Sequence, residues 1–272
     1  MTPDDLVREY GVQFALAETL GPALLVYQQL FHAVSSDVVV VSDASMRDGL
    51  LLDLAREVTG RQDETLARGV VHSAMGLARK YCVDMDHARA VAEMAVSLFD
   101  QLAGEHGLDG RHRLLLRVAA LLHEIGGFVS GRAHHKHGLY LISNTEVFGL
   151  TRSELLIVAH VARYHRRSAP KPSHAEFMAL PREDRIVVSK LAALLRIADA
   201  LDRTHGREAL KFTCLRRGEE LVIRVHGVSD LTLERRALAE KADLFEDLHG
   251  LIVRLEEAPD EPSSHRRAQP MT

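Results

Sequence analysis

The sequence of 272 residues contains no tryptophan and two cysteines, and aromatic residues make up only 5% of it. Cys82 and Cys214 stand far apart and form no CxxC pattern, which excludes a thiolate zinc site and a disulfide scaffold. No apolar run approaches the roughly 20 residues that span a bilayer. The first residues, MTPDDLVREYG, are acidic where a signal peptide would be basic and then apolar. We therefore expect a cytoplasmic protein with no membrane segment.

The composition is that of an ordinary folded protein, with 46% hydrophobic and 26% charged residues. Because aromatic residues are few while alanine and leucine abound, helix is favoured over strand. The formal net charge of −4 argues against a general nucleic-acid binder, although a local basic patch is compatible with it. The expected fold class is mainly α.

Hydrophobic periodicity divides the chain into four segments, 1–60, 61–207, 208–256 and 257–272. In the first segment we expect helix over 3–33, with a break near Gly21-Pro22. A short buried strand at 37–41 and a helix at 47–58 follow, which together suggest part of an α/β unit. Since one strand cannot make a sheet, its neighbours must come from elsewhere in the chain, from a partner or from a missing segment.

The segment 61–207 is expected to be helical throughout, because stretches such as RLLLRVAALL and KLAALLRIADAL are apolar nearly all round, like helices in the middle of a bundle. The segment 208–256 changes to strand periodicity and predicts a small β-β-α-β subdomain. It has two strands joined by a turn at Arg217-Gly218-Glu219, one helix over 230–248 and a strand over 251–257. The segment 257–272 lacks apolar residues and is expected to be a disordered tail.

Ionisable side chains interrupt three of the apolar helices, at His87, at the adjacent pair His123-Glu124 and at Asp199. This order is similar to that of HD-domain phosphohydrolases, in which such groups hold a divalent metal ion that activates water against a phosphate ester. The ion would be Mg²⁺, Mn²⁺ or Fe²⁺. The HD pattern has aspartate after histidine, whereas this chain has the longer Glu124. The alternative is therefore a buried polar cluster without a metal, in which Asp199 or Glu124 accepts protons from His87 and His123.

A basic segment lies between residues 131 and 171, where seven lysines and arginines stand against two glutamates. The spacing of Arg163, Arg166 and Arg167 lets their side chains converge at one helix end. Such a concentration of positive charge predicts an anion site for phosphate groups. The alternative is a solvated polar face that is balanced by the acidic segment 230–261. Nucleic acid is disfavoured, because no aromatic residues alternate with the basic ones as stacking platforms.

Five motifs occur in an order that resembles the C-terminal half of the exopolyphosphatase and guanosine pentaphosphate phosphatase family. The resemblance extends from about residue 1 to residue 256 and is carried by VVVVSDASMRDGLLLDLA, AALLHEIGG, HHKHGLYLIS, ARYHRR and LLRIADALDRTH. It implies an HD-like helical domain, preceded by a partial actin-like α/β element and followed by the small α/β subdomain. The neighbours of the strand at 37–41 would then belong to the N-terminal half.

The resemblance also bears on activity. Members of that family carry their Gly-rich phosphate loops and catalytic carboxylate in N-terminal actin-like domains, and no such loop is present in this sequence. The family's HD-like domain is associated with a basic channel for polyphosphate and with dimerisation. By this resemblance we assign polyphosphate or guanosine polyphosphate binding to Lys136, Arg163, His165, Arg166 and Arg167. A homodimer, and a separate chain that carries the catalytic half, are the further partners implied.

Two functions therefore stay open at the level of sequence. In the first, the chain is a phosphate-binding and dimerisation module that has no turnover alone. In the second, it is a free-standing HD-type metal-dependent phosphohydrolase that acts on a nucleotide or phosphate ester through His87, His123, Glu124 and Asp199. A regulatory partner that senses guanosine polyphosphates is a weaker third possibility, because HD domains also occur in alarmone hydrolases.

Overall fold

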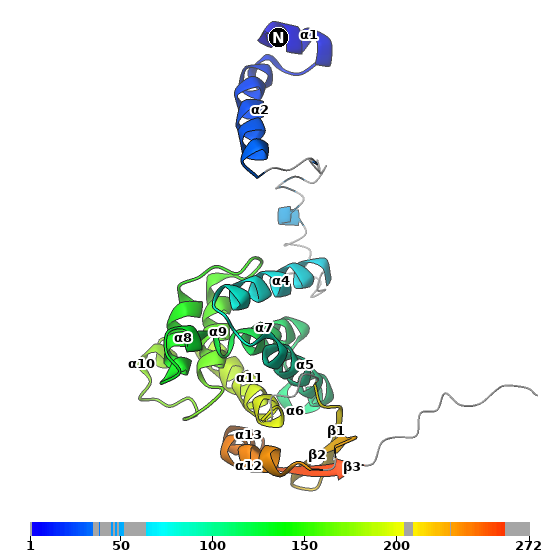
Figure 1. Ribbon diagram of the computed structural model, residues 1–272, viewed down its shortest axis with the longest axis vertical. Helices are drawn as coiled ribbons and strands as arrows, with labels where there is room; N and C mark the ends of the chain where they lie inside the picture. The colour runs from blue at the N-terminus through cyan, green and yellow to red at the C-terminus, as the bar shows by residue number, and fades with distance from the viewer. Residues whose placement is uncertain are drawn as a thin grey trace, which may run out of the picture. The chain divides into compact units, whose positions relative to one another are not determined.

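The computed structural model describes residues 2–34, 38, 45, 47, 49–51, 64–203, 209–228 and 230–258. The chain forms two compact units, Met1–Thr59 and Gly60–Thr272. Most of the described residues lie in helices, which confirms the expected mainly helical class (Figure 1). Among the described residues we find no helix with the length and apolar character of a membrane span.

The first unit contains two helices, α1 (Pro3–Tyr10) and α2 (Phe14–Val34). Gly11 ends α1 with a φ of +65°, a left-handed conformation that glycine adopts without strain. The predicted break near Gly21-Pro22 is wrong, because α2 continues through Pro22 and the interruption lies at Gly11 instead. All of the predicted strand at 37–41 except Val38 lies outside the described residues. Of the predicted helix at 47–58, residues 47 and 49–51 are described, and they are helical.

The second unit begins with a set of helices that enclose one apolar core. These are α4 (Glu64–Lys80), α5 (Met85–Gln101), α6 (Ala103–His106), α7 (Gly110–Leu122), the 3₁₀ turn η1 (Ile125–Phe128), α8 (His134–Ser143), α9 (Arg152–Arg163), α10 (Ala175–Met178) and α11 (Arg182–Leu201). Helix α11 contacts α5, α7 and α9, and its residues from 191 to 201 are all buried. This helix is therefore the centre of the unit, as its nearly continuous apolar sequence indicates.

A small sheet and two helices follow α11 in the chain. Strand β1 (Phe212–Arg217) pairs antiparallel with β2 (Glu220–His226), and β3 (Ile252–Ala258) pairs parallel with β2 on its other side. The connection from β2 to β3 contains α12 (Thr232–Lys241) and α13 (Asp243–His249). Figure 1 shows these elements together at one end of the unit, beyond the C-terminal part of α11.

The single helix expected over 230–248 is wrong, because it is divided into α12 and α13 at Ala242. The reason lies in Arg196 of α11, whose guanidinium is fully buried. Its Nε donates to the carbonyl oxygen of Lys241 at 2.9 Å, and its Nη2 donates to the carboxylate of Asp243 at 2.6 Å. A carbonyl at the end of α12 is thus satisfied from α11 rather than by a continued helix.

A close approach of two backbones places the residues after α7 against α8. A Cβ atom on Gly126 would overlap the carbonyl oxygen of His134 and the amide nitrogen of Gly138, whereas one on the neighbouring Gly127 would meet open space. Only glycine therefore fits at residue 126. This contact fixes the distance between His123-Glu124, just before η1, and His134 at the start of α8.

We expect the substitution Gly126→Ala to lower the free energy of unfolding by roughly 3 kcal/mol, because relief of the overlap requires one of two packed backbones to move. The matched change Gly127→Ala should alter it by less than about 0.5 kcal/mol, as at an ordinary exposed position. Urea unfolding followed by circular dichroism measures both. Equal stability of the two variants would contradict this account of the contact.

Candidate functional site

The predicted ionisable residues of the three helices come together in the second unit. His87 lies in the first turn of α5, and the carboxylate of Asp84, the N-cap residue of that helix, accepts from the backbone N–H of His87 at 3.3 Å. His123 ends α7, and Asp199 projects from the last turn of α11. All three are buried, and the two histidines meet with their Nε2 atoms 3.2 Å apart. Asp199 Oδ1 lies 3.6 Å and 3.8 Å from those two nitrogens.

The outer nitrogen of each ring in this pair faces an oxygen. Nδ1 of His87 lies 2.5 Å from the carboxylate of Asp202, and Nδ1 of His123 lies 2.7 Å from the carbonyl oxygen of Ala120. A histidine that donates from Nδ1 presents Nε2 as its acceptor, which is the arrangement of a metal ligand held by a carboxylate or carbonyl. Sequence reasoning missed Asp202, although it follows Asp199 by three residues and so shares its helix face.

A second pair of histidines lies beside the first. His134 of α8 and His165, just after α9, are both buried, and their Nε2 atoms are 3.3 Å apart. Nδ1 of His165 donates to the carbonyl oxygen of Ala162 at 2.6 Å, and Nδ1 of His134 lies 3.3 Å from that of Gly131. His165 was predicted to bind an anion, and the structure places its side chain in this buried cluster.

Glu124 connects the two pairs. It can offer an oxygen to a metal ion together with His87 and His123, and equally together with His134 and His165. Its carboxylate is 4.0 Å from Nε2 of His134, and about a third of its side chain is exposed. Ring centroids of His123 and His165 are 5.0 Å apart. The residues present therefore fit a metal ion by donor type, since imidazole and carboxylate are the ligands of Zn²⁺, Mn²⁺ and Fe²⁺ sites.

Burial and charge set the protonation of these groups. Burial lowers the pKa of His123, and it lowers the pKa of His165 well below the ordinary value. For His87 burial acts in the same direction, but the hydrogen bond to Asp202 and the charge of Asp199 outweigh it and raise the pKa. Without a metal, a proton on His87 can thus bridge the first pair, which is how the alternative of a polar core cluster would be satisfied.

Asp199 is held by a residue that sequence reasoning did not include. Lys241, at the end of α12, donates to its carboxylate. Burial would raise the pKa of Asp199, but the charges of Lys241 and His123 hold it well below the usual range. The proposed pairing in which Asp199 or Glu124 accepts from the two histidines is therefore incomplete: Asp202 accepts from His87, and Lys241 occupies one oxygen of Asp199.

A pocket of about 530 Å³ opens onto this cluster. Glu124, His165 and Asp199 face it, and the other residues that line it are mostly cationic. They are Arg166, Arg167, Arg203, Arg236 and Lys241, together with Leu233, Ala237 and Glu240. Arg166 is the cation nearest the histidines, with Nη1 3.4 Å from Nε2 of His134. Five basic side chains against three acidic ones form a site suited to a multiply charged anion.

Two of the predicted anion-binding residues lie outside the lining of this pocket. Arg163 is paired with Glu176 at 3.0 Å and lies over the ring of Tyr164, and Lys136 is exposed on α8. In exchange, α12 contributes Arg236 and Lys241, from the segment 230–261 that was considered as an acidic counterpart to the basic patch. The sequence analysis judged that segment by its acidic net charge. Arg236 and Lys241 were therefore not considered as anion-binding residues, although both line the pocket.

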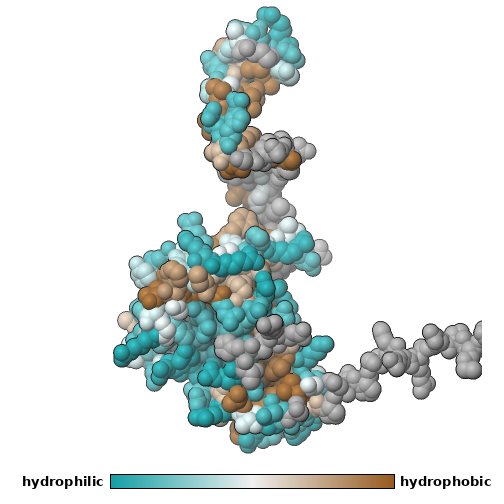
Figure 2. Space-filling model, viewed as in Figure 1, coloured by the Kyte–Doolittle hydropathy of each residue, from teal (hydrophilic) through white to brown (hydrophobic). Residues whose placement is uncertain are grey.

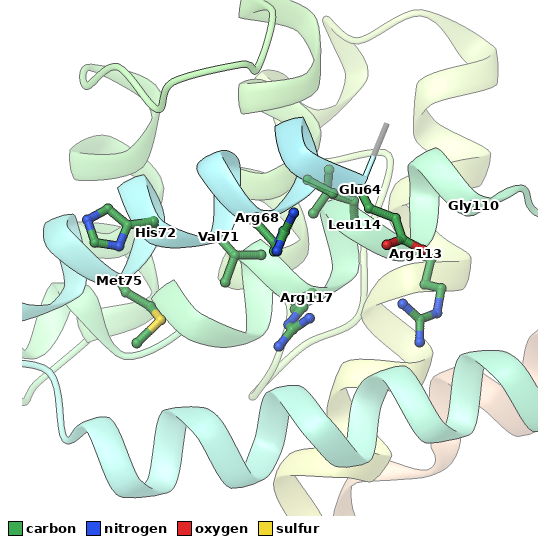
Figure 3. A pocket seen from close by; sticks show the side chains of 10 residues that line it. Glu64, Arg68, Val71, His72, Met75, Gly110, Arg113, Leu114 and Arg117 are labelled. Atoms are coloured by element: carbon green, nitrogen blue, oxygen red, sulfur yellow. The ribbon is translucent and has the colours of Figure 1, made fainter. Parts of the chain in front are cut away.

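Another pocket, of about 660 Å³, lies between α4 and α7. Figure 3 shows Arg68 and Arg117 there, with Arg113, which is paired with Asp100 at 2.7 Å, near one end. Of the ionisable residues that line it, Glu64, Arg68, His72 and Arg117 are exposed and Arg113 is half-buried. Because the buried ionisable groups gather at the first pocket, we take that pocket, and not this one, as the candidate site.

Comparison with known proteins finds relatives that match most of the second unit. The family model "Ppx/GppA phosphatase, domain III" matches residues 71–247. The chain is 27% identical over 196 residues to the guanosine-5'-triphosphate,3'-diphosphate pyrophosphatase of Pseudoalteromonas atlantica, which covers 72% of this chain and 37% of that protein. It is 30% identical over 194 residues to the corresponding protein of Aeromonas hydrophila, at 68% and 36%. The chain therefore spans little more than a third of the length of these relatives.

We expect the substitution Lys241→Met to lower the free energy of unfolding at pH 7 by about 3 kcal/mol, because it leaves a buried carboxylate without its countercharge. Since the folded state depresses the pKa of Asp199, the ion pair contributes stability above the ordinary aspartate pKa of about 4 and loses it below that value. The difference in the free energy of unfolding between Lys241→Met and the unsubstituted protein should thus become smaller as the pH falls below about 4. Denaturant unfolding at several pH values measures it, with the exposed Lys211→Met as control. A difference that is constant with pH would contradict the assignment.

Proposed function

This chain belongs to the Ppx/GppA phosphatase family, and we propose that its domain III binds a phosphate-rich anion, polyphosphate or a guanosine polyphosphate, in the pocket above the histidine cluster. The observation that carries the proposal is the convergence of Arg166, Arg167 and Arg236 on one pocket from separate elements. An arginine binds two phosphate oxygens at once through its planar guanidinium, so several of them around one cavity favour a ligand with several phosphates.

The names of the relatives support the choice of ligand class. Those proteins are pyrophosphatases of guanosine-5'-triphosphate,3'-diphosphate, whose phosphates are distributed over two positions of one nucleotide. In this proposal the domain retains such an anion, and the family's N-terminal catalytic domain, on this or another chain, carries out hydrolysis.

Replacing either arginine nearest the cluster should weaken binding. A hydrogen bond to a charged group contributes about 1.5–3 kcal/mol, so Arg166→Gln and Arg167→Gln should each lower affinity by about tenfold to a hundredfold. The control is Arg254→Gln on β3, whose arginine is exposed, paired with Glu220 and outside this pocket. Calorimetric titration with polyphosphate of defined length and with guanosine pentaphosphate, at two salt concentrations, measures the change. Unaltered affinity in both pocket variants would overturn the proposal.

The second candidate function is that of an HD-type metal-dependent phosphohydrolase. The Nε2 atoms of His87 and His123, 3.2 Å apart and within reach of Glu124, favour it, and Asp199 is the further ligand. A bound divalent ion would supply Lewis-acid catalysis and a water of lowered pKa. His87, His123, Glu124 and Asp199 would hold that ion, and Asp202 would orient His87 through its contact with Nδ1.

The two functions differ in turnover by the chain alone. The binding module should release no phosphate from polyphosphate or guanosine pentaphosphate in the presence of Mn²⁺ or Mg²⁺. Release that is measured with purified protein and abolished by His123→Asn, but retained in the control His135→Asn, would favour the phosphohydrolase. His135 is adjacent to the cluster in sequence and is absent from both groups of possible ligands among the described residues.

We also propose that the chain forms a homodimer, as expected for the module. The support is the apolar surface of α2, where Leu24, Leu25 and Tyr27 are each more than half exposed, and which Figure 2 shows in brown within the first unit. Sedimentation velocity over a range of concentrations should show a dimer, and Leu25→Asp should shift it towards monomer. A monomer at every concentration would contradict this part of the proposal.

A further inference from the structure

The second histidine pair poses a problem that the binding of an anion does not solve. His165 uses its Nδ1–H on the carbonyl oxygen of Ala162, and His134 directs Nδ1 towards that of Gly131. A neutral imidazole has one N–H, so with that proton on Nδ1 in both rings the two Nε2 atoms that face each other at 3.3 Å are both acceptors. Two lone pairs at that distance repel each other unless a proton or a cation lies between them.

A shared proton is better supported in the first pair than in the second. There the carboxylates of Asp199 and Asp202 surround His87. The second pair has Glu124 as its nearest carboxylate, at 4.0 Å from His134. Arg166 lies on the pocket side, where its Nη1 is 3.4 Å from Nε2 and 3.5 Å from Nδ1 of His134, so it contacts that ring at both nitrogens.

The distance between the two nitrogens matches a shared metal ion. Two imidazole nitrogens that each lie about 2.0–2.1 Å from a tetrahedrally coordinated ion are about 3.3 Å from each other. The observed separations are 3.2 Å in the first pair and 3.3 Å in the second. In each case Glu124 supplies a carboxylate oxygen within 4.8 Å of both ring nitrogens.

We infer that Glu124, His134 and His165 form a second metal position, which shares Glu124 with the position made by His87 and His123. The site as a whole would then hold two transition-metal ions joined by one carboxylate. This inference rests on the metal-binding candidate function above and extends it. Four imidazoles and few carboxylates favour Zn²⁺, Fe²⁺ or Co²⁺ over Mg²⁺, which prefers oxygen ligands.

The two proposed metal positions face the arginine-lined pocket. Glu124 and His165 both line the pocket that contains Arg166 and Arg167. An anion in that pocket would therefore meet the metal ions at one end and guanidinium groups at the other. A phosphate ester or a phosphoanhydride, with oxygens for both, is the ligand class that such a pocket accommodates.

Counting bound ions tests the inference. The full chain is purified without chelator or affinity tag, stripped, and dialysed against Co²⁺, and the ions bound per chain are then counted by mass spectrometry. We expect two ions in the unsubstituted protein and one in His134→Asn or His165→Asn. Asparagine places an amide N–H near the position of Nδ1, so the bond to the backbone carbonyl is kept while Nε2 is removed. His87→Asn should also leave one ion, at the second position, and Glu124→Gln should weaken both.

The control is His160→Asn in α9, because His160 is buried like the ligands but is absent from both possible ligand groups among the described residues. It should retain two ions, and circular dichroism should show that each variant is folded. Suppose that the unsubstituted protein binds one ion, which is lost in His123→Asn but kept in both His134→Asn and His165→Asn. That result would overturn the proposed second metal position and leave the first. No ion at all would overturn both, while anion binding measured without metal would still decide the proposed function separately.

Discussion

Ionisable side chains buried in a helical core are the constraint on which the rest of this structure depends. Within a few turns, α11 and its C-cap residue contribute Arg196, Asp199 and Asp202, and all three are buried. An unpaired charge there would cost several kcal/mol, so each determines what must pack against α11. Asp202 requires a donor and meets His87 of α5, while Asp199 requires a cation and meets Lys241 of α12. These pairings place α5 and α12 beside the central helix α11. As a result, the ionisable side chains of the three helices gather at one site.

The same constraint joins the helices to the small sheet. Arg196 donates to the backbone at the end of α12 and to Asp243 at the start of α13, and it also reaches the carbonyl oxygens of Tyr164 and Arg167 after α9. One guanidinium thus connects α12 with the residues that follow α9, and both of these segments line the pocket. Arg167 has a positive φ of 64°, a conformation uncommon outside glycine, and its carbonyl oxygen is one of those that Arg196 holds. The pocket is therefore supported by buried contacts behind it, while exposed cations such as Arg167 and Arg236 line its surface.

Much of the fold and half of the site could be predicted from the sequence. Apolar helices that carry His87, His123 and Asp199 indicate a polar cluster directly, because each residue's place is set by helical periodicity within its own segment. His134 could not be assigned to it in the same way, since its position depends on the contact of Gly126 with α8, which is a tertiary property. His165 was placed with its basic neighbours, and it lines the pocket with Arg166 and Arg167, but its ring is also buried against that of His134. The basic residues of α12 were concealed by the acidic residues around them.

We propose that a phosphate-rich anion binds where the cations of α12 and those after α9 face the histidine cluster. Hydrogen–deuterium exchange of the full chain, with and without polyphosphate, tests this most directly because it reports each segment separately. The account predicts slower exchange in peptides that cover residues 163–167 and 233–241, the two segments that contribute cations from opposite walls. Protection confined to residues 64–75 and 110–117, around the other basic pocket of Figure 3, would contradict it, as would no protection at all.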